Sequence, residues 1–316
     1  MTESLRARLL GLVLRLTEKR RLARVRDPLR LRRGFAWKAR LLFPPPWGTR
    51  IASATLDGRR ALWLRGPGVV APMADPSRID DPSKPVILYF HGGGYVFGAP
   101  ETHRGLLARL SDATGFPGCL PDYRLAPEHP FPAAIEDALA AWRALADRPG
   151  GVILGGDSAG GGLALAALAE GLRQGLAPPR AAFGLSPLTD LTFSGMSLRD
   201  NARADAMLPA DRANEITSMY LAGADPRDPR ASPLFADFTG APPVWLTAGR
   251  TEILLDDTRR MAARLRAQGI AVTAGIAGDL PHVWPFFPPW MLPESGQTLA
   301  VLAAWLKSPA ASSGGS

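Results

Sequence analysis

The sequence contains a single cysteine, Cys119, among its 316 residues. One cysteine cannot form an intrachain disulfide bond, and it cannot build a cysteine-based zinc cluster. The scarcity of cysteine fits a reducing compartment. We predict no metal site from this composition.

Long hydrophobic runs are also missing. No apolar stretch reaches the roughly 20 residues that a membrane-spanning helix needs. The longest apolar piece near the N-terminus, residues 9–14, is interrupted by Arg15 and is shorter than the apolar region of a signal peptide. We therefore predict a cytoplasmic protein with no stable membrane insertion.

Acidic residues are scarce at one end of the chain. Residues 1–40 hold 13 Arg and Lys against three acids, a net charge of +10, whereas the whole chain carries +8. The remaining 276 residues carry −2. The basic character therefore belongs to the N-terminal arm, residues 1–47, and does not indicate a nucleic-acid partner.

Leucines within residues 3–26 recur at helical spacing, namely Leu5, Leu9, Leu12 and Leu16. Because arginines fill the positions between them, the pattern predicts a basic amphipathic helix. Such a helix can form one wall of a cap over an active site, or it can lie on anionic lipid. We favour the cap because Phe35 and Trp37, which follow, resemble an apolar lining.

After the arm, strand-like and helix-like segments alternate. Two strand-like runs flank Asp57-Gly58, a hairpin signal, and residues 66–85 read as a loop. Core strands are predicted at 85–90, 119–123, 152–154, 183–186, 243–249 and 270–276. Helices are predicted at 102–114, 133–146, 163–172, 257–268 and 297–307. This alternation predicts an α/β fold with a mostly parallel sheet and helices on both faces.

Residues 188–240 interrupt the alternation, because they are polar, contain proline and hold one helical segment at 212–221. We interpret them as an insertion. The predicted domain organisation is a helical cap from 1–47 and 188–240, and a catalytic core from 48–187 and 241–307. The small residues 308–316 are predicted to be a disordered tail.

The stretch 151–162 carries the first chemical motif. An apolar run is followed by Gly156-Asp157-Ser158-Ala159-Gly160, and then by a segment rich in Ala and Leu. A Gly-x-Ser-x-Gly sequence between a strand and a helix is typical of a nucleophile elbow. Gly156 and Gly160 lack the Cβ that such a tight turn would crowd. Ser158 is the predicted nucleophile.

A second motif, His91-Gly92-Gly93-Gly94, follows the predicted strand at 85–90. Successive glycines leave backbone N–H groups free to face a cavity, where they can form an oxyanion hole.

A serine nucleophile needs a base, and the base needs an acid to orient it. In α/β hydrolases these partners follow in the order serine, acid, histidine. Of the four histidines only His282 comes after Ser158, so His282 is the predicted base. Glu252 lies closest to the end of the preceding strand and is the predicted acid, with Asp256 in reserve.

Together these motifs resemble the hormone-sensitive-lipase-like family of bacterial carboxylesterases. The resemblance covers about residues 45–307 and rests on five motifs: residues 91–94, 122–128, 156–161, Ser186-Pro187 with Thr189-Asp190, and His282-Val283. The Gly-Asp-Ser-Ala-Gly form points to one branch of that family.

The resemblance implies an α/β-hydrolase fold with a helical cap, no cofactor, and hydrolysis of short- to medium-chain acyl esters. It also implies that backbone N–H groups of Gly93, Gly94 and Ala159 form the oxyanion hole, braced by His91 and residues 123–128. Many relatives have aspartate where this chain has Glu252.

The substrate partner is expected to be a small-molecule ester. Four aromatic residues are candidates for an apolar acyl pocket: Phe35, Trp37, Tyr95 and Trp284. An amidase or lactonase with the same triad remains an alternative. A non-catalytic ligand-binding protein of this fold is disfavoured, since such proteins lose the triad histidine and His282 is present. The sequence leaves open whether the chain forms a homodimer.

Overall fold

The computed structural model describes residues 3–68 and 81–308. Part of the predicted loop at 66–85, and the predicted tail apart from Ser308, lie outside these ranges. The described chain folds around an eight-stranded sheet with the order β1-β2-β4-β3-β5-β6-β7-β8. The strands are β1 (Arg50–Leu56), β2 (Arg59–Arg65), β3 (Val86–Phe90), β4 (Gly118–Pro121), β5 (Val152–Asp157), β6 (Ala181–Leu185), β7 (Val244–Gly249) and β8 (Val272–Ala277).

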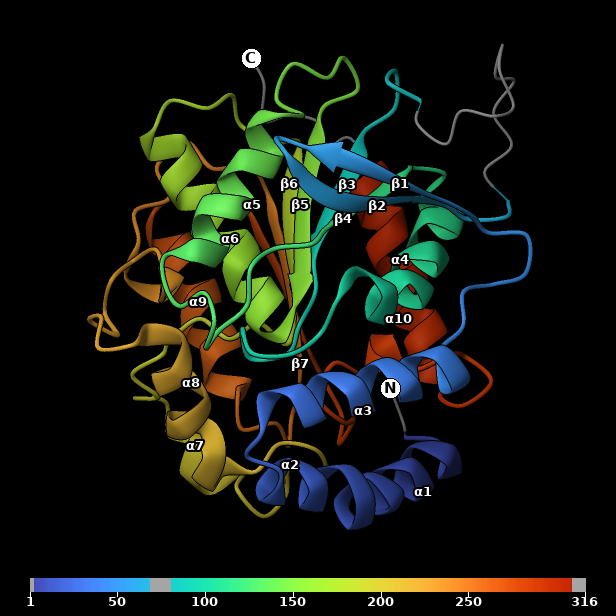
Figure 1. The fold of residues 1–316 in the computed structure, drawn as a ribbon, viewed down its shortest axis with the longest axis vertical. Helices are drawn as coiled ribbons and strands as arrows, with labels where there is room; N and C mark the ends of the chain where they lie inside the picture. Colours follow the sequence, from blue (N-terminus) through green and yellow to red (C-terminus); the bar gives the residue numbers. More distant parts are fainter. Residues whose placement is uncertain (1–2, 69–80, 309–316) are drawn as a thin grey trace.

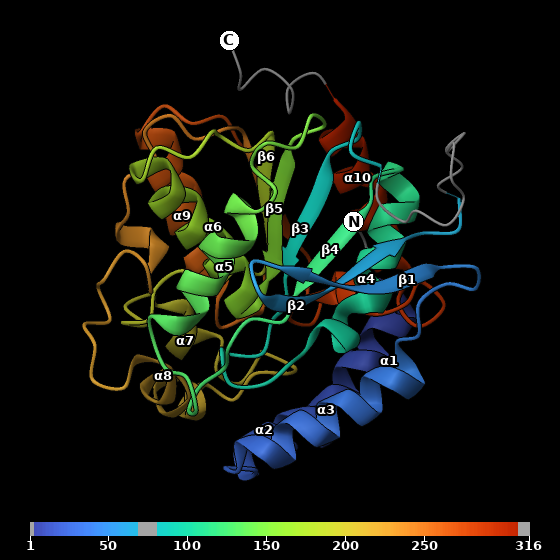
Figure 2. The same cartoon turned by 45° about the horizontal axis from the view of Figure 1, so that its top comes forward.

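The sheet is parallel from β4 to β8, as the alternation predicts. The exception is β2, which pairs antiparallel with both β1 and β4. The predicted hairpin joins β1 to β2 through Asp57 and Gly58, whose φ angles of 47° and 77° are those of a tight hairpin turn. Figure 2 shows the central strands β3, β5 and β6 side by side.

Helices cover both faces of the sheet (Figure 1). One face packs on α5 (Ala133–Arg143), α6 (Ser158–Arg173) and α9 (Leu255–Ala267), and the other on α4 (Pro100–Thr114) and α10 (Pro293–Lys307). The side chains of β3 show the alternation: Leu88 and Phe90 belong to the first core, and Ile87 and Tyr89 to the second.

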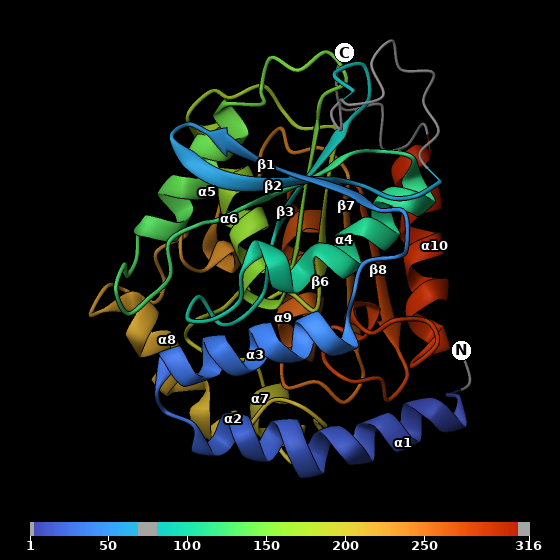
Figure 3. The same ribbon diagram turned by 45° about the vertical axis from the view of Figure 1, so that its right-hand side comes forward.

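The N-terminal arm is helical for longer than predicted. Within the predicted helix at 3–26, α1 (Leu5–Leu14) continues through a π-helical turn (Arg15–Lys19) into α2 (Arg20–Arg24). A further helix, α3 (Pro28–Leu42), was not predicted, although Asp27 and Pro28 signal its start: the Asp27 carboxylate accepts a hydrogen bond from the Leu29 N–H at 2.9 Å. At one end of the molecule α1 and α2 form one continuous row, and α3 runs alongside it (Figures 1 and 3).

The insertion at 188–240 contains two helices, α7 (Ser197–Asp200) and α8 (Ala213–Leu221), joined by irregular segments. It is tied to the arm by Arg212, whose guanidinium donates hydrogen bonds to the carbonyls of Leu22 and Ala23 at 3.3 and 2.9 Å. In the described ranges, no helix is both long and apolar enough to cross a membrane.

Candidate active site

Ser158 stands where β5 ends and α6 begins. Its φ angle is +51°, in the left-handed region that side chains other than glycine rarely adopt. A Cβ on Gly156 would press against the Gly160 carbonyl, and a Cβ on Gly160 would press against the carbonyls of Phe90 and His91. The two glycines therefore permit the sharp turn, as the sequence motif predicts.

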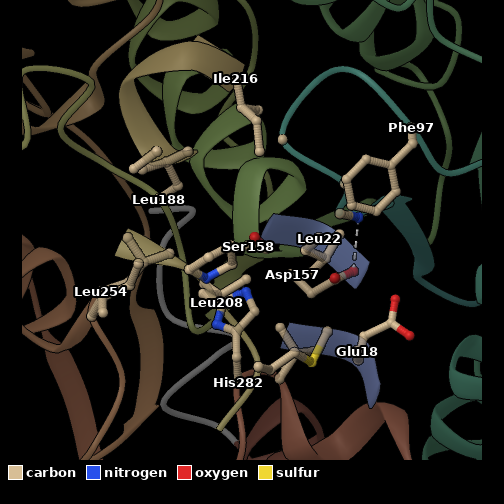
Figure 4. A pocket seen from close by; sticks show the side chains of 18 of the residues that line it. Glu18, Leu22, Phe97, Asp157, Ser158, Leu188, Leu208, Ile216, Leu254 and His282 are labelled. Atoms are coloured by element: carbon tan, nitrogen blue, oxygen red, sulfur yellow. Dashed lines mark hydrogen bonds between the residues drawn. The ribbon is translucent and has the colours of Figure 1, made fainter. Parts of the chain in front are cut away.

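Glu252 and His282 come together behind the serine. The Nδ1 atom of His282 lies 2.6 Å from Oε2 of Glu252, and both side chains are buried. The opposite ring nitrogen, Nε2, is also buried but has no hydrogen-bond partner among the described residues. Ser158 and His282 border the same cavity (Figure 4). The pair thus presents an unoccupied nitrogen to the space beside the serine.

The carboxylate of Glu252 changes the proton affinity of its partner. Burial alone would lower the pKa of His282, but the charge of Glu252 and its hydrogen bond outweigh burial, so that the pKa is raised above 6.5. A buried histidine without the carboxylate would be a weaker base.

The reserve acid Asp256 is bound elsewhere. Its Oδ2 accepts a hydrogen bond from the Ser197 N–H at 2.9 Å, and its Oδ1 lies 3.6 Å from Arg259. Between the two candidate acids, the geometry favours Glu252, which alone of the two contacts His282.

Ser186 belongs to this site, although no role for it is predicted from the sequence. Its hydroxyl donates a hydrogen bond to Oε1 of Glu252 at 2.8 Å and accepts one from the Val283 N–H at 3.2 Å. One side chain thereby joins the acid to the loop that carries His282. The sequence signal that could have indicated this role is a serine directly after β6, the strand next to β7.

The glycine loop 92–94 lines the same cavity as Ser158. Gly93 and Gly94 have φ angles of 128° and 61°, which favour glycine. No described residue accepts a hydrogen bond from the N–H of either, and both line the cavity. Ala159 lies in the first turn of α6, where backbone N–H groups lack helical partners.

The bracing of this loop involves the residues that the resemblance implies. The rings of His91 and Tyr123 stack with centroids 4.3 Å apart, and the Tyr123 hydroxyl donates to the His91 carbonyl at 2.7 Å. The Ala126 N–H donates to the Tyr95 carbonyl at 2.9 Å.

A second buried histidine and carboxylate also support the loop. Asp157 Oδ1 accepts hydrogen bonds from the Gly92 N–H at 3.1 Å and from the Tyr89 hydroxyl at 2.8 Å. His103 Nε2 lies 3.3 Å from the same oxygen. Burial would raise the pKa of Asp157, but His103 and the hydrogen bonds outweigh it, and the pKa is lowered. No role for either residue is predicted from the sequence.

The cavity has a volume of about 130 Å³ and is mostly apolar. The arm contributes Glu18, Leu22 and Phe35 to its wall, and the insertion contributes residues between Leu188 and Thr217. Phe97, Phe286 and Phe287 complete its aromatic lining. Within the described ranges, no three His, Cys, Asp or Glu residues cluster so as to hold a metal ion.

Of the four predicted pocket residues, Phe35 lines this cavity, and the other three are not among its lining residues. Trp37 is 65% exposed, because it lies on the outer side of α3. Tyr95 stacks on Tyr220 with centroids 3.8 Å apart. Trp284 is buried in a separate cluster, and its indole N–H donates to Thr298 at 2.9 Å.

The sheet, its two helical layers and the elbow serine define an α/β hydrolase. A family model described as the alpha/beta hydrolase fold matches residues 87–286. The chain belongs to this family.

Individual proteins are similar over more of the chain. The acetyl-hydrolase of Streptomyces hygroscopicus is 42% identical over 226 residues, which cover 70% of this chain and 75% of that protein. A solved esterase from the bacterial hormone-sensitive lipase family is 35% identical, with a TM-score of 0.85, covering 97% of this chain and 99% of the other. EstE5 soaked with p-nitrophenyl butyrate is 37% identical, with a TM-score of 0.86 and coverage of 98% and 99%. The predicted family resemblance is confirmed.

Proposed function

We propose that the chain is a serine carboxylesterase that hydrolyses short- to medium-chain acyl esters through an acyl-enzyme intermediate. The observation that carries this proposal is the unoccupied Nε2 of His282, which borders the same cavity as Ser158 while Nδ1 is held by Glu252. The names of the related esterases and acetyl-hydrolase support the same reaction class.

In the proposed reaction, Nε2 of His282 takes the proton of the Ser158 hydroxyl as its oxygen attacks the ester carbonyl. When it takes this proton, the imidazole of His282 becomes a cation, which the carboxylate of Glu252 stabilises. His282 then donates the proton to the leaving alcohol, and water repeats the steps to release the acid.

The N–H groups of Gly93, Gly94 and Ala159 are the proposed oxyanion hole. Two of these have no acceptor among the described residues, and the third lies at the N-terminus of a 16-residue helix whose dipole favours negative charge there. Preorganised donors of this kind typically contribute about 10²–10³ each to the rate.

The arm and the insertion are proposed to act together as a cap on the core. Both contribute side chains to the cavity wall, and Arg212 links them. An apolar cavity of this size suits a short acyl chain. The cytoplasmic location of the protein and its possible assembly into a homodimer stay predictions from the sequence.

The test is the hydrolysis of p-nitrophenyl esters from acetate to palmitate by the wild type and by Ser158→Ala. We expect turnover that is fastest for short chains, and a loss of about 10⁴-fold or more in the variant. Wild-type rates in a folded Ser158→Ala would overturn the assignment. If the folded wild type cleaves no ester in the series, the amidase and lactonase alternatives take precedence.

A further inference from the structure

The outer face of α1 and of the π-helical turn that follows carries an apolar stripe. We define the stripe as five residues whose side chains are between 49% and 72% exposed: Leu5, Leu9, Leu12, Val13 and Leu16. At 100° per residue, four of them fall within one 60° sector and Val13 lies beside it. A helix on the surface of a globular protein normally turns polar residues outward, and this one does the opposite.

The stripe is not the core-facing side of a helix that has lost its packing contacts. The opposite side of α1 is already packed, since Ala7 and Leu14 are buried in a cluster with Trp284, Phe287 and Leu292. Polar contacts fix the same side at both ends. At one end the Ser4 N–H donates to Glu294 at 2.8 Å. At the other, the Lys19 ammonium donates to the carbonyls of Ala202 and Asp205 at 2.8 and 2.7 Å.

Arginines border the stripe on both sides. On the helical wheel Arg6 lies on one border, and Arg8 and Arg15 lie on the other. All three are exposed. Further exposed arginines follow along the arm at Arg20, Arg24, Arg26, Arg30, Arg33 and Arg40. An apolar sector between cationic borders is the arrangement of helices that lie in the plane of a membrane interface.

We propose that the stripe docks on an anionic lipid surface, with its leucines at the level of the acyl chains and the bordering arginines at the headgroups. Charge complementarity selects this occupant. Residues 1–40 carry a net charge of +10, so an anionic surface attracts the arm. A second copy of the chain, docked stripe to stripe, would bring two such arms together against their repulsion.

Docking would also bring the reaction cavity to the lipid. The arm that carries the stripe contributes Glu18 and Leu22 to the cavity wall. Esters dissolved in the lipid would then meet a cavity whose wall is part of the docked arm. This inference concerns binding, so its test does not depend on the proposed triad.

The test is co-sedimentation with phosphatidylcholine vesicles and with vesicles of equal parts phosphatidylcholine and phosphatidylglycerol. Binding is measured on the Ser158→Ala background, so that lipid hydrolysis cannot alter the vesicles. We expect binding to the anionic vesicles only. Binding should weaken at about 1 M salt, where the Debye length is about 3 Å. The triple variant Leu9→Ser, Leu12→Ser and Leu16→Ser should bind about a hundredfold more weakly.

The matched control is Ile276→Ser with Val301→Ser, which removes exposed apolar side chains outside the arm (41% and 60% exposed). It should bind like the parent protein. On the wild-type background, the triple variant should keep full activity on soluble p-nitrophenyl butyrate. Equal vesicle binding by parent and triple variant would overturn the proposal. The proposal would also be overturned if the parent protein and the control variant were dimers in solution and the triple variant were a monomer. The stripe would then be a self-association surface.

Discussion

Two buried histidine–carboxylate pairs contribute side chains to the cavity that Ser158 borders. His282 and Glu252 are joined at 2.6 Å, and His103 and Asp157 at 3.3 Å. His282, His103 and Asp157 all border the reaction cavity. Residue type and burial alone would not tell which pair serves the proposed chemistry.

The pairs differ in what the second ring nitrogen contacts. His103 Nδ1 lies 2.7 Å from the Thr102 hydroxyl, so both of its nitrogens are occupied. His282 Nε2 has no partner among the described residues. A base must have an atom free to accept the proton. The first pair can therefore move a proton, whereas the second can only hold its surroundings in place.

What the second pair holds is the glycine loop. Asp157 Oδ1 accepts the Gly92 N–H, and the next two residues supply the proposed oxyanion donors. The two pairs thus divide the proposed reaction between them. One activates the nucleophile, and the other fixes the groups that receive the charge.

Among changes to the two pairs, the largest effect is expected for Glu252→Gln. The Gln carbonyl can still accept from Ser186, but its NH₂ group would then face Nδ1 of His282 and favour the wrong tautomer. We expect kcat to fall by about 10³–10⁴-fold. The acidic limb of kcat/KM should also move to lower pH, because the carboxylate that raises the pKa of His282 above 6.5 is gone while burial, which lowers it, remains.

The control for this change is Asp256→Asn, which alters the reserve acid that contacts Ser197 and Arg259. Its pH profile should match that of the wild type. An acidic limb that moves in Asp256→Asn and stays in Glu252→Gln would reverse the assignment of the acid.

A smaller effect is expected for Asp157→Asn, which removes the charge of the second pair. The loop should lose its fixed position, and kcat should fall by about 10²-fold with little change in KM, as when one oxyanion donor is lost. The acidic limb of the pH profile should move to lower pH by less than in Glu252→Gln, because the charge of Asp157 also raises the pKa of His282 but Glu252 is the main contributor. Stopped-flow kinetics across pH, with thermal melting to check the fold, would measure this. An acidic limb that moves as far as in Glu252→Gln would mean that the two pairs do not act separately.

The first pair could be predicted from sequence and the second could not. Chain order and the strand positions around Glu252 and His282 are local signals that follow from the fold. The role of His103 depends on α4 packing its ring beside the end of β5, and the sequence spacing of His103 and Asp157 does not encode that contact. The same limit applies to Trp37 and Tyr95, whose residue type suggests a pocket but whose side chains do not line this cavity.

The smallest effect concerns Phe35, whose ring packs edge-on against His103 at a centroid distance of 5.8 Å and lines the cavity. Phe35→Ala should enlarge the cavity and shift the preference toward longer acyl chains, by about fourfold in kcat/KM for each added methylene that the new space accepts. Trp37→Ala, two residues along α3 but 65% exposed, is the matched control and should keep the wild-type preference. The p-nitrophenyl ester series measures both. An equal shift in the two variants would mean that α3 as a whole, and not the ring beside the second pair, sets the acyl length.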